Sequence, residues 1–274
     1  MRALRHRLGS ALNEQHRAQA RRCAVLVGAL TRDRAVARAV LAGRSNLGFC
    51  PICGRKVLFV RKSAWLRDNY ECLFCRSIPR QRVVIRVLET LFPQWRSMTI
   101  HESSPGSPSS DKISRECKHY VPSHFYEDTP LGSYRNGVRC ENLEKMTFGD
   151  ESFDLVITQD VFEHVLNPAQ AFGEIARILR PGGAHVFTVP YYYWKRTLIR
   201  ALESSGGIEY LEPPDYHGNP IDEKGSLVVT EWGPELVDFI YMHSGLTTTI
   251  YNIHDVRMGL EAAFLDAFVS VKKR

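Results

Sequence analysis

The alternation of strand-like and helix-like segments after residue 97 is the feature that most constrains the fold of this chain. The runs "SFDLVITQD" (152–160) and "AHVFTVP" (184–190) are apolar enough for buried strands, and "NPAQAFGEIARILRPGG" (167–183) between them has helical periodicity. Such alternation predicts an α/β fold with a mainly parallel sheet covered on both faces. Two strand-like runs in succession, 247–255 and 262–273, predict an antiparallel pair at one edge.

The first 45 residues are expected to form basic helices. Leu4, Leu8 and Leu12 recur at helical spacing among arginines, and a second helix is predicted from about Asp33. Residues 1–96 contain 20 Lys and Arg against 5 Asp and Glu, whereas the rest of the chain contains 16 against 25. This asymmetry is typical of a front that meets an anionic partner, or simply of solvated helix faces.

Two tight cysteine pairs lie in residues 46–78. Cys50 and Cys53 form the first pair, Cys72 and Cys75 the second, and 18 residues separate them. Each C-x-x-C turn offers two sulfurs, so the four predict a zinc ribbon with a structural Zn²⁺. A redox dithiol and an iron–sulfur cluster remain alternatives. This use of cysteine favours a reducing compartment, and we expect a cytoplasmic protein.

Residues 79–274 are predicted to form the main domain. Within it, about 191–232 breaks the alternation and is rich in Tyr, Pro, Gly and His, which is typical of a lid or binding loop. No apolar run approaches the ~18 residues that a membrane span needs, so we expect none. Nothing in the sequence indicates the oligomeric state.

The run "FGDESFDLVITQDVFEHVLNPAQAFGEIARILRPGGAHVFTVP" (148–190) resembles class I S-adenosylmethionine-dependent methyltransferases. It is most similar to the type 11 group, in which the fourth strand ends in D-x-x-E-H-V and the next helix in LRPGG. The resemblance implies a Rossmann-like, seven-stranded sheet with an antiparallel last strand, and S-adenosyl-L-methionine as cofactor. Together with the four-cysteine ribbon, it also resembles a ribosomal RNA guanine methyltransferase that carries a zinc ribbon.

The stretch "TIHESSPGSPSS" (99–110) occupies the place of the family's first strand and glycine-rich cofactor loop. The resemblance puts Glu102 at the acid that ends this strand and Ser103 at the start of the loop. Of the loop's glycines only Gly106 remains. Small serines allow a similar approach of backbone to cofactor, but the motif departs from the family pattern.

Further cofactor residues follow from the same resemblance. His124 stands where the family has the ribose-binding acid, with two acids of "YED" directly behind it. Asn142 is placed at the adenine amino group and Leu143 against the ring. Gln159 and Asp160 are expected at the junction of cofactor and substrate.

The cluster of Asp160, Glu163 and His164, joined by His217 in the lid, leaves three interpretations open. The acid and the imidazole brace the loop and cap the following helix. Alternatively, the cluster holds Mg²⁺ or a similar ion, because it resembles the E-x-x-E-H cluster and later His of the small-RNA 2′-O-methyltransferases. In the third interpretation, His164 or His217 is a general base without metal.

We therefore expect a methyltransferase that methylates O or N of a small molecule or glycan precursor. The aromatic run 191–194 is predicted to form a wall for the acceptor or to pack under the lid. One alternative is an RNA methyltransferase that grips RNA through its basic N-terminal region. Another is a non-catalytic adaptor whose altered loop no longer holds cofactor.

Overall fold

The computed structural model describes Gly28, residues 33–218 and residues 225–274. The helix predicted around Leu4–Leu12 lies outside these residues. The helix predicted from Asp33 is present as α2 (Arg34–Leu41), and the Asp33 carboxylate caps it by accepting from the amides of Ala35 and Val36 at 2.9 and 3.2 Å.

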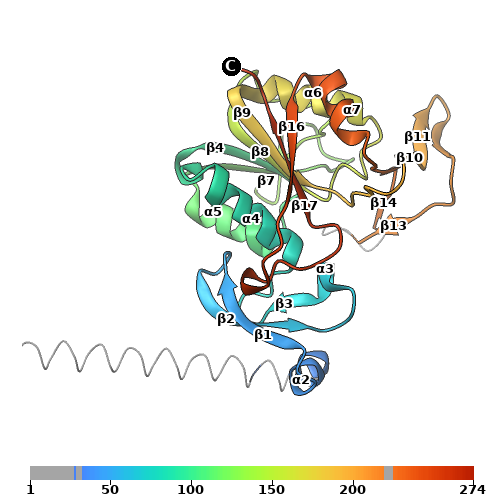
Figure 1. The fold of residues 1–274 in the computed structure, drawn as a ribbon. Helices are drawn as coiled ribbons and strands as arrows, with labels where there is room; N and C mark the ends of the chain where they lie inside the picture. The colour runs from blue at the N-terminus through green and yellow to red at the C-terminus, as the bar shows by residue number, and fades with distance from the viewer. Residues whose placement is uncertain (1–27, 29–32, 219–224) are drawn as a thin grey trace, which may run out of the picture.

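The cysteine-bearing segment forms a small antiparallel sheet at one end of the molecule (Figure 1). Its strands are β1 (Ser45–Cys50), β2 (Arg55–Arg61) and β3 (Tyr70–Cys72), and the short helix α3 (Leu66–Asn69) precedes β3. The strand order is β1-β2-β3. Each cysteine pair begins at the last residue of a strand, Cys50 in β1 and Cys72 in β3, and continues into a tight turn. We refer to residues 46–78, which contain this sheet and its turns apart from Ser45, as the ribbon.

The main sheet has strand order β16-β17-β9-β8-β4-β5-β7-β6. The five strands β4, β5, β7, β8 and β9 run parallel, while β17 is antiparallel to both of its neighbours, which confirms the Rossmann-like fold and the reversed last strand. Within the described residues the sheet has eight strands rather than seven, because a two-residue strand pairs beyond β7. The strands are β4 (Thr99–Ser103), β5 (His119–His124), β6 (Tyr134–Arg135), β7 (Val138–Cys140), β8 (Phe153–Gln159), β9 (Leu179–Thr188), β16 (Thr247–Asn252) and β17 (Asp266–Val271).

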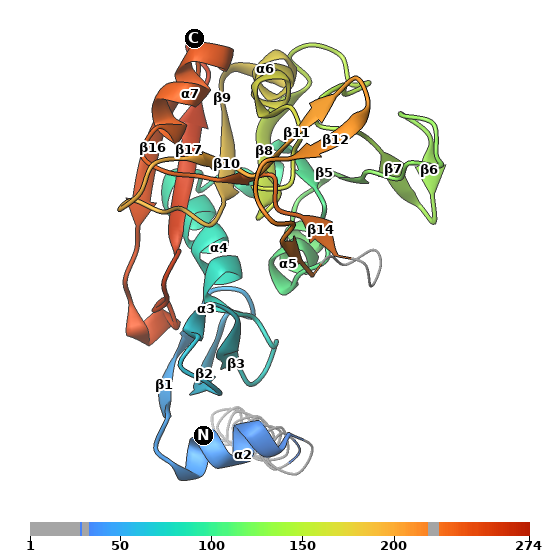
Figure 2. The same ribbon diagram turned by 90° about the vertical axis from the view of Figure 1, so that its right-hand side faces the viewer.

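Four helices cover the two faces of this sheet (Figures 1 and 2). On one face lie α4 (Pro79–Leu91) and α5 (Pro108–Glu116), and on the other α6 (Pro168–Ile178) and α7 (Leu236–Ser244). Proline opens α4, α5 and α6, where a missing backbone N–H costs nothing.

The predicted extent of α6 was too long. The helix ends at Ile178, and "LRPGG" (179–183) forms the start of β9 instead of a helix terminus. Leu179 has extended backbone angles, and the close backbone approach at this point requires glycine. A Cβ on Gly183 would lie 2.9 Å from the carbonyl oxygens of Arg180 and Asp154.

The ribbon shares one hydrophobic core with the main domain. Phe59 and Tyr70 of the ribbon belong to the same buried cluster as Ile100 and Leu155 of the main sheet. The loop between β16 and β17, which contains the 3₁₀ turn η2 (Val256–Met258), reaches down to the ribbon (Figure 1). The fully buried Arg82 joins this loop to the ribbon, because it donates to the carbonyl of Tyr70 at 2.8 Å and to that of Gly259 at 2.7 Å.

The predicted lid, 191–232, contains three short two-stranded pairs among its described residues (Figure 2). They lie beside the carboxyl edge of the main sheet rather than within it. The pairs are β10 (Leu198–Ile199) with β15 (Thr230–Glu231), β11 (Ala201–Ser204) with β12 (Gly207–Tyr210), and β13 (Tyr216–His217) with β14 (Ser226–Leu227).

None of the helices in the described parts of the chain is long and apolar enough to cross a membrane.

Candidate active site

A cleft of about 1720 Å³ runs along the carboxyl ends of the parallel strands. In open α/β sheets this edge is where ligands bind, because the loops that follow the strands diverge there. The ribbon, the lid and the loop that contains Phe264 complete the walls of the cleft. Of the residues predicted to bind cofactor or substrate, the cleft is lined by Ser103, Gly106, Asn142, Leu143, Gln159, Asp160, Glu163, His164 and His217.

The serine-rich loop after β4 bends sharply toward the cleft. Ser104 has φ +56° and Gly106 has φ +148°, and both line the cleft with Ser107. Ser107 then caps α5, since its hydroxyl accepts from the Ser110 amide at 3.3 Å. The loop therefore keeps its small side chains and its backbone against the cleft with a single glycine in the bend.

Glu102 does not face the cleft, although the sequence predicted it as a cofactor residue. Its side chain is buried and accepts hydrogen bonds from Ser110 at 2.8 Å, Tyr120 at 2.7 Å and Gln159 at 2.8 Å. Burial raises the pKa of this carboxyl, and the three donors oppose the shift. Glu102 thus braces β4, α5 and β8 from behind the loop.

His124 is likewise absent from the lining of the cleft, where the next residues, Phe125 to Asp128, take its place. Burial lowers the pKa of His124. Asn142 and Leu143 are at the predicted position after β7. The Asn142 side chain accepts from the amide of Glu144 at 2.9 Å, which fixes the turn that presents both residues.

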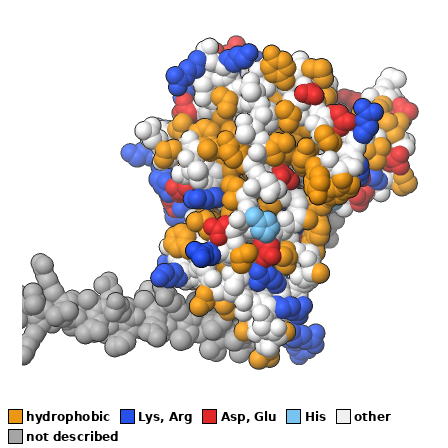
Figure 3. Space-filling view, in the orientation of Figure 1, with side chains coloured by type: hydrophobic (Ala, Val, Ile, Leu, Met, Phe, Trp, Pro, Cys, Tyr) orange, Lys and Arg blue, Asp and Glu red, His pale blue; other side chains and the backbone are white. Residues whose placement is uncertain are grey.

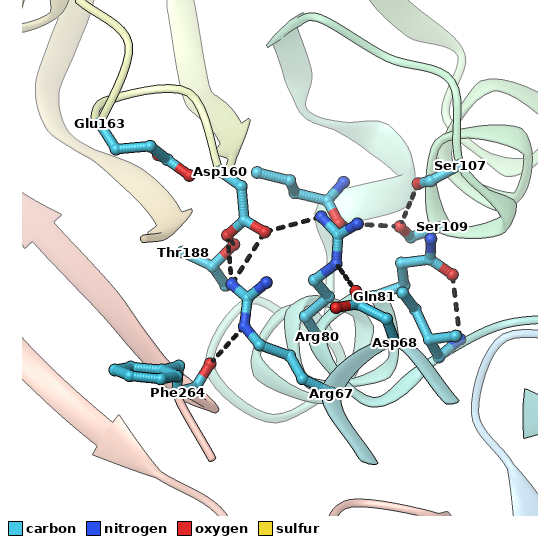
Figure 4. Close-up of polar contacts among 12 residues, drawn as sticks. Arg67, Asp68, Arg80, Gln81, Ser107, Ser109, Asp160, Glu163, Thr188 and Phe264 are labelled. Atoms are coloured by element: carbon cyan, nitrogen blue, oxygen red, sulfur yellow. Dashed lines mark hydrogen bonds and ion pairs between the residues drawn. The ribbon is translucent and has the colours of Figure 1, made fainter. Parts of the chain in front are cut away.

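Asp160, directly after β8, is held by residues that the sequence did not point to. Arg67 Nη2 lies 2.8 Å from both of its carboxylate oxygens, Arg80 Nη1 lies 2.7 Å from Oδ2, and Thr188 donates to Oδ1 at 2.9 Å (Figure 4). Burial would raise the pKa of Asp160, but the two guanidinium groups outweigh it and lower the pKa to about 2. With φ +53°, its backbone is also left-handed.

These partners come from the ribbon side of the molecule. Arg67 belongs to α3, between the two cysteine pairs, and Arg80 stands at the start of α4. The excess of Lys and Arg over Asp and Glu in residues 1–96 was apparent from the sequence. No sequence signal indicated that Arg67 reaches a residue 93 positions later in the chain.

Glu163, His164 and His217 come together at the lid side of the cleft. One potential ligand atom from each lies within 4.8 Å of the others. Glu163 is 1% exposed, and none of the residues that the structure describes forms a hydrogen bond with its carboxylate oxygens. Burial and the neighbouring Asp160 raise its pKa well above the ordinary value. The His164 ring lies edge-on to that of His217, with centroids 5.4 Å apart.

The lid is fastened to the same two residues. The backbone carbonyl of Glu163 accepts from the amides of Val229 and Thr230 at 2.7 and 3.1 Å, and His164 Nδ1 lies 2.8 Å from the carbonyl oxygen of Leu227. The predicted bracing of the loop is therefore present. The predicted helix cap is not, because α6 begins at Pro168, four residues beyond His164, and is capped by Asn167.

An aromatic wall joins three distant segments of the chain. Phe264 contacts Tyr192 of the lid and Trp65 of the ribbon, with ring centroids 4.8 and 6.0 Å apart, and all three line the cleft. Trp194 packs on Phe264 at 5.7 Å, outside the cleft lining. The aromatic run after β9 thus supplies a wall residue, Tyr192, and a supporting contact on Phe264 from Trp194, which is 59% exposed.

The four ribbon cysteines converge on one point. Their sulfur atoms all lie within 4.8 Å of one another, and Cys50 and Cys75 are 3.7 Å apart. Tetrahedral coordination at Zn–S distances of about 2.3 Å requires sulfurs roughly 3.8 Å apart, so the cluster fits a four-thiolate zinc site. The two other described cysteines, Cys117 and Cys140, are buried and lie outside the cluster.

Comparison with known proteins identifies the central part of the chain. Residues 115–187 match the family model described as "Methyltransferase domain". This segment is therefore similar to a methyltransferase domain. The match runs from the last two residues of α5 into β9, and it supports the methyltransferase prediction for this part of the chain.

Two curated relatives match short segments. One, a dimethylglycine N-methyltransferase of Parasynechococcus marenigrum, is 41% identical over 53 residues, which are 19% of each chain. The other, a probable S-adenosylmethionine-dependent methyltransferase of Mycolicibacterium smegmatis, is 38% identical over 56 residues, 20% of this chain and 22% of the relative. The chain thus spans about a fifth of the length of these relatives.

Among solved structures, an S-adenosylmethionine-dependent methyltransferase from Mesorhizobium loti is similar over 70% of this chain and 98% of its own. The sequence identity is 14% and the TM-score 0.46.

Proposed function

We propose that the chain is an S-adenosylmethionine-dependent methyltransferase that methylates a hydroxyl oxygen of a small polar molecule, such as a glycan precursor. One observation carries the proposal. A single cleft joins the bend after β4 to the set of Glu163, His164 and His217. A cofactor pocket and a group able to activate an acceptor thus face the same space.

The residues at the bend fit the cofactor. Ser103, Ser104 and Gly106 present short side chains and backbone at the carboxyl end of β4, and Asn142 and Leu143 stand where the nucleoside would lie. When bound, the cofactor supplies a methyl group on a sulfonium. The chain aligns this group with the acceptor and excludes water from the line of transfer. The adaptor alternative is disfavoured, because protein side chains leave the cleft open.

The Glu163 set fits a divalent cation. A buried carboxylate without a hydrogen-bond partner is costly, and a cation satisfies it. His164 directs Nδ1 at the Leu227 carbonyl, so Nε2, 3.7 Å from Glu163 Oε1, keeps its lone pair. Two imidazoles with one carboxylate suit Mn²⁺ or a similar ion better than Mg²⁺. When bound, such an ion lowers the pKa of a coordinated hydroxyl.

The aromatic wall supports a small acceptor with a flat or sugar-like face. Phe264 and Ser107 of the bend after β4 lie on opposite sides of Arg67 and Arg80 (Figure 4), and Tyr192 packs on Phe264. Lys and Arg side chains gather around the ribbon end of the molecule (Figure 3). Such a basic surface is compatible with RNA, and RNA as the acceptor stays a prediction. We also propose a structural Zn²⁺ at Cys50, Cys53, Cys72 and Cys75, with 46–78 as the ribbon and 79–274 as the methyltransferase domain.

Calorimetry on the zinc-loaded full chain tests the cofactor and the cation separately. We expect S-adenosylhomocysteine to bind in the micromolar range, and Mn²⁺ to bind at one further site per chain. His217→Ala and Glu163→Gln should weaken Mn²⁺ binding at least tenfold and leave S-adenosylhomocysteine binding unchanged. His254→Ala, an exposed histidine outside the cleft, is the control.

Each contrary outcome points to a different alternative. If S-adenosylhomocysteine gives no heat at high micromolar concentration, the proposed function is wrong and the adaptor is favoured. If the wild-type protein binds no Mn²⁺ but His217→Ala still abolishes methylation of a found acceptor, the histidine acts as a general base. Copurifying nucleic acid whose binding falls steeply with salt would favour RNA.

A further inference from the structure

We infer that Arg80 binds the carboxylate of the cofactor's amino-acid part. The inference rests on the proposed function and extends it, because it names the residue that distinguishes a complete adenosyl amino acid from a truncated nucleoside. Arg80 stands one residue into α4, directly after the ribbon, and its side chain lines the cleft.

The two ends of the cleft differ in chemistry. At the β7 end, Leu143, Phe125 and Tyr126 offer apolar and aromatic surface to a flat base. At the β8 end, charged groups cluster around Asp160. The strand order β8-β4-β5-β7 places the serine bend between these two ends. A zwitterionic amino-acid tail belongs at the charged end, which puts its carboxylate near the arginines.

Among the described residues three arginines line the cleft, and Arg80 differs from the other two in its position and exposure rather than in a lack of acidic partners. Arg135 pairs with Asp128 at 2.6 Å and lies over the Tyr126 ring, at the nucleoside end. Arg67 is 7% exposed and points both Nη2 and Nε at protein oxygens, those of Asp160 and the Phe264 carbonyl. The Arg80 side chain is 28% exposed, which makes it the most accessible cation at the charged end among the described residues.

The guanidinium of Arg80 is already oriented for an anion. Asp160 accepts from Nη1 at 2.7 Å, and Asp68 Oδ1 lies 3.3 Å from Nε (Figure 4). No residue that the structure describes accepts a hydrogen bond from Nη2. The planar fork suits a carboxylate, and holding it in advance reduces the entropy lost on binding. Asp68 also lines the cleft, beside the same guanidinium, as a counterion for the ligand's ammonium group.

Calorimetry with three ligands tests the role of Arg80. S-Adenosylhomocysteine carries the amino-acid carboxylate, its carboxamide has the same shape but lacks the charge and has NH2 in place of one oxygen, and 5′-methylthioadenosine lacks the whole tail. For the wild-type protein we expect the carboxamide to bind at least tenfold more weakly than S-adenosylhomocysteine. Arg80→Met should weaken S-adenosylhomocysteine binding about 10- to 100-fold and change 5′-methylthioadenosine binding less than twofold. Arg86→Met, on the same helix and outside the cleft, should change neither.

The contrary outcomes separate this inference from the proposed function. If the wild-type protein binds none of the three ligands, the proposed function fails and takes the inference with it. If S-adenosylhomocysteine binds but Arg80→Met weakens all three ligands equally, or none, only the inference is overturned. The carboxamide comparison needs no variant, so equal affinity of the wild-type protein for acid and amide overturns it even where Arg80→Met does not fold.

Discussion

Arg67 from the ribbon and Asp160 from the end of β8 form a buried pair, in which Nη2 lies 2.8 Å from each carboxylate oxygen. Their side chains are 8% and 11% exposed. Arg67→Met removes one of the two guanidinium groups that balance the buried negative charge of Asp160. We therefore expect it to lower the free energy of unfolding by about 3–5 kcal/mol. Urea denaturation above pH 5 measures the loss.

A double-mutant cycle supplies the control for this pair. Asp160→Asn in the Arg67→Met background should recover part of the loss, because no uncompensated carboxylate is then buried. If the two single losses simply add, the pair is not coupled and the interpretation is wrong.

Zinc removal should unfold more than the ribbon. Phe59 and Tyr70 belong to the same core as the main sheet, so Cys72→Ser is expected to lose the metal and destabilise the whole chain by on the order of several kcal/mol. Elemental analysis should give one zinc per chain for the wild-type protein. The control variant Cys117→Ser, which removes a buried thiol outside the cluster, should retain one zinc per chain. A Cys72→Ser protein that retains one zinc would refute the site.

Gly259→Ala should loosen the contact between the ribbon and the loop before β17. Gly259 has φ +67°, and a Cβ there would lie 2.8 Å from the Phe59 ring and 3.0 Å from Arg82 Nε. Backbone strain and overpacking together should cost about 2–4 kcal/mol in urea denaturation. Gly245→Ala is matched in φ, +69°, but has open space around it, so about 1–2 kcal/mol is expected. Equal losses would show that the contact with Phe59 contributes nothing.

Two buried histidines should make the protein sensitive to acid. Burial lowers the pKa of His101 and His185 from 6.5 to about 3. Between these pH values the unfolded state binds the proton and the folded state does not. Stability therefore falls as the pH drops from 6.5 toward 3, by up to about 1.4 kcal/mol per pH unit for each histidine.

His101→Gln isolates one of these contributions. Glutamine still offers a polar group to Ser123, which His101 Nε2 contacts at 2.9 Å. Urea denaturation at pH 4 to 6 should show a slope shallower than wild type by about 1.4 kcal/mol per pH unit. The exposed His119→Gln should keep the wild-type slope. A His101→Gln slope equal to wild type would mean that the histidine is protonated inside the fold.

The main fold was predictable because it depends on local patterns. The periodicity of apolar residues, the turn residues and the strand–helix alternation specify the order of elements. The reversed β17 agrees with the prediction. The boundary of α6 was missed, because "LRPGG" follows a strongly helical run and only the neighbouring backbone of β8 selects the extended form.

The site was predictable only in part. The polar residues that follow β4, β7 and β8 lie at the cleft, since the ends of parallel strands share one edge. The burial of Glu102 was not predictable, because it depends on Ser110 and Tyr120 turning toward it. Arg67, Arg80 and Phe264 reach the cleft through tertiary packing between segments far apart in the chain, which single-sequence patterns do not encode.

The segment between the two cysteine pairs carries Trp65, Arg67 and Asp68 into the wall of the cleft. Because the ribbon forms part of the wall of the cleft, replacing it with an unrelated zinc-binding unit would also change the cleft. The proposed Zn²⁺ site and the choice of ligand are thereby linked through one stretch of sequence, and substitutions there should alter both together.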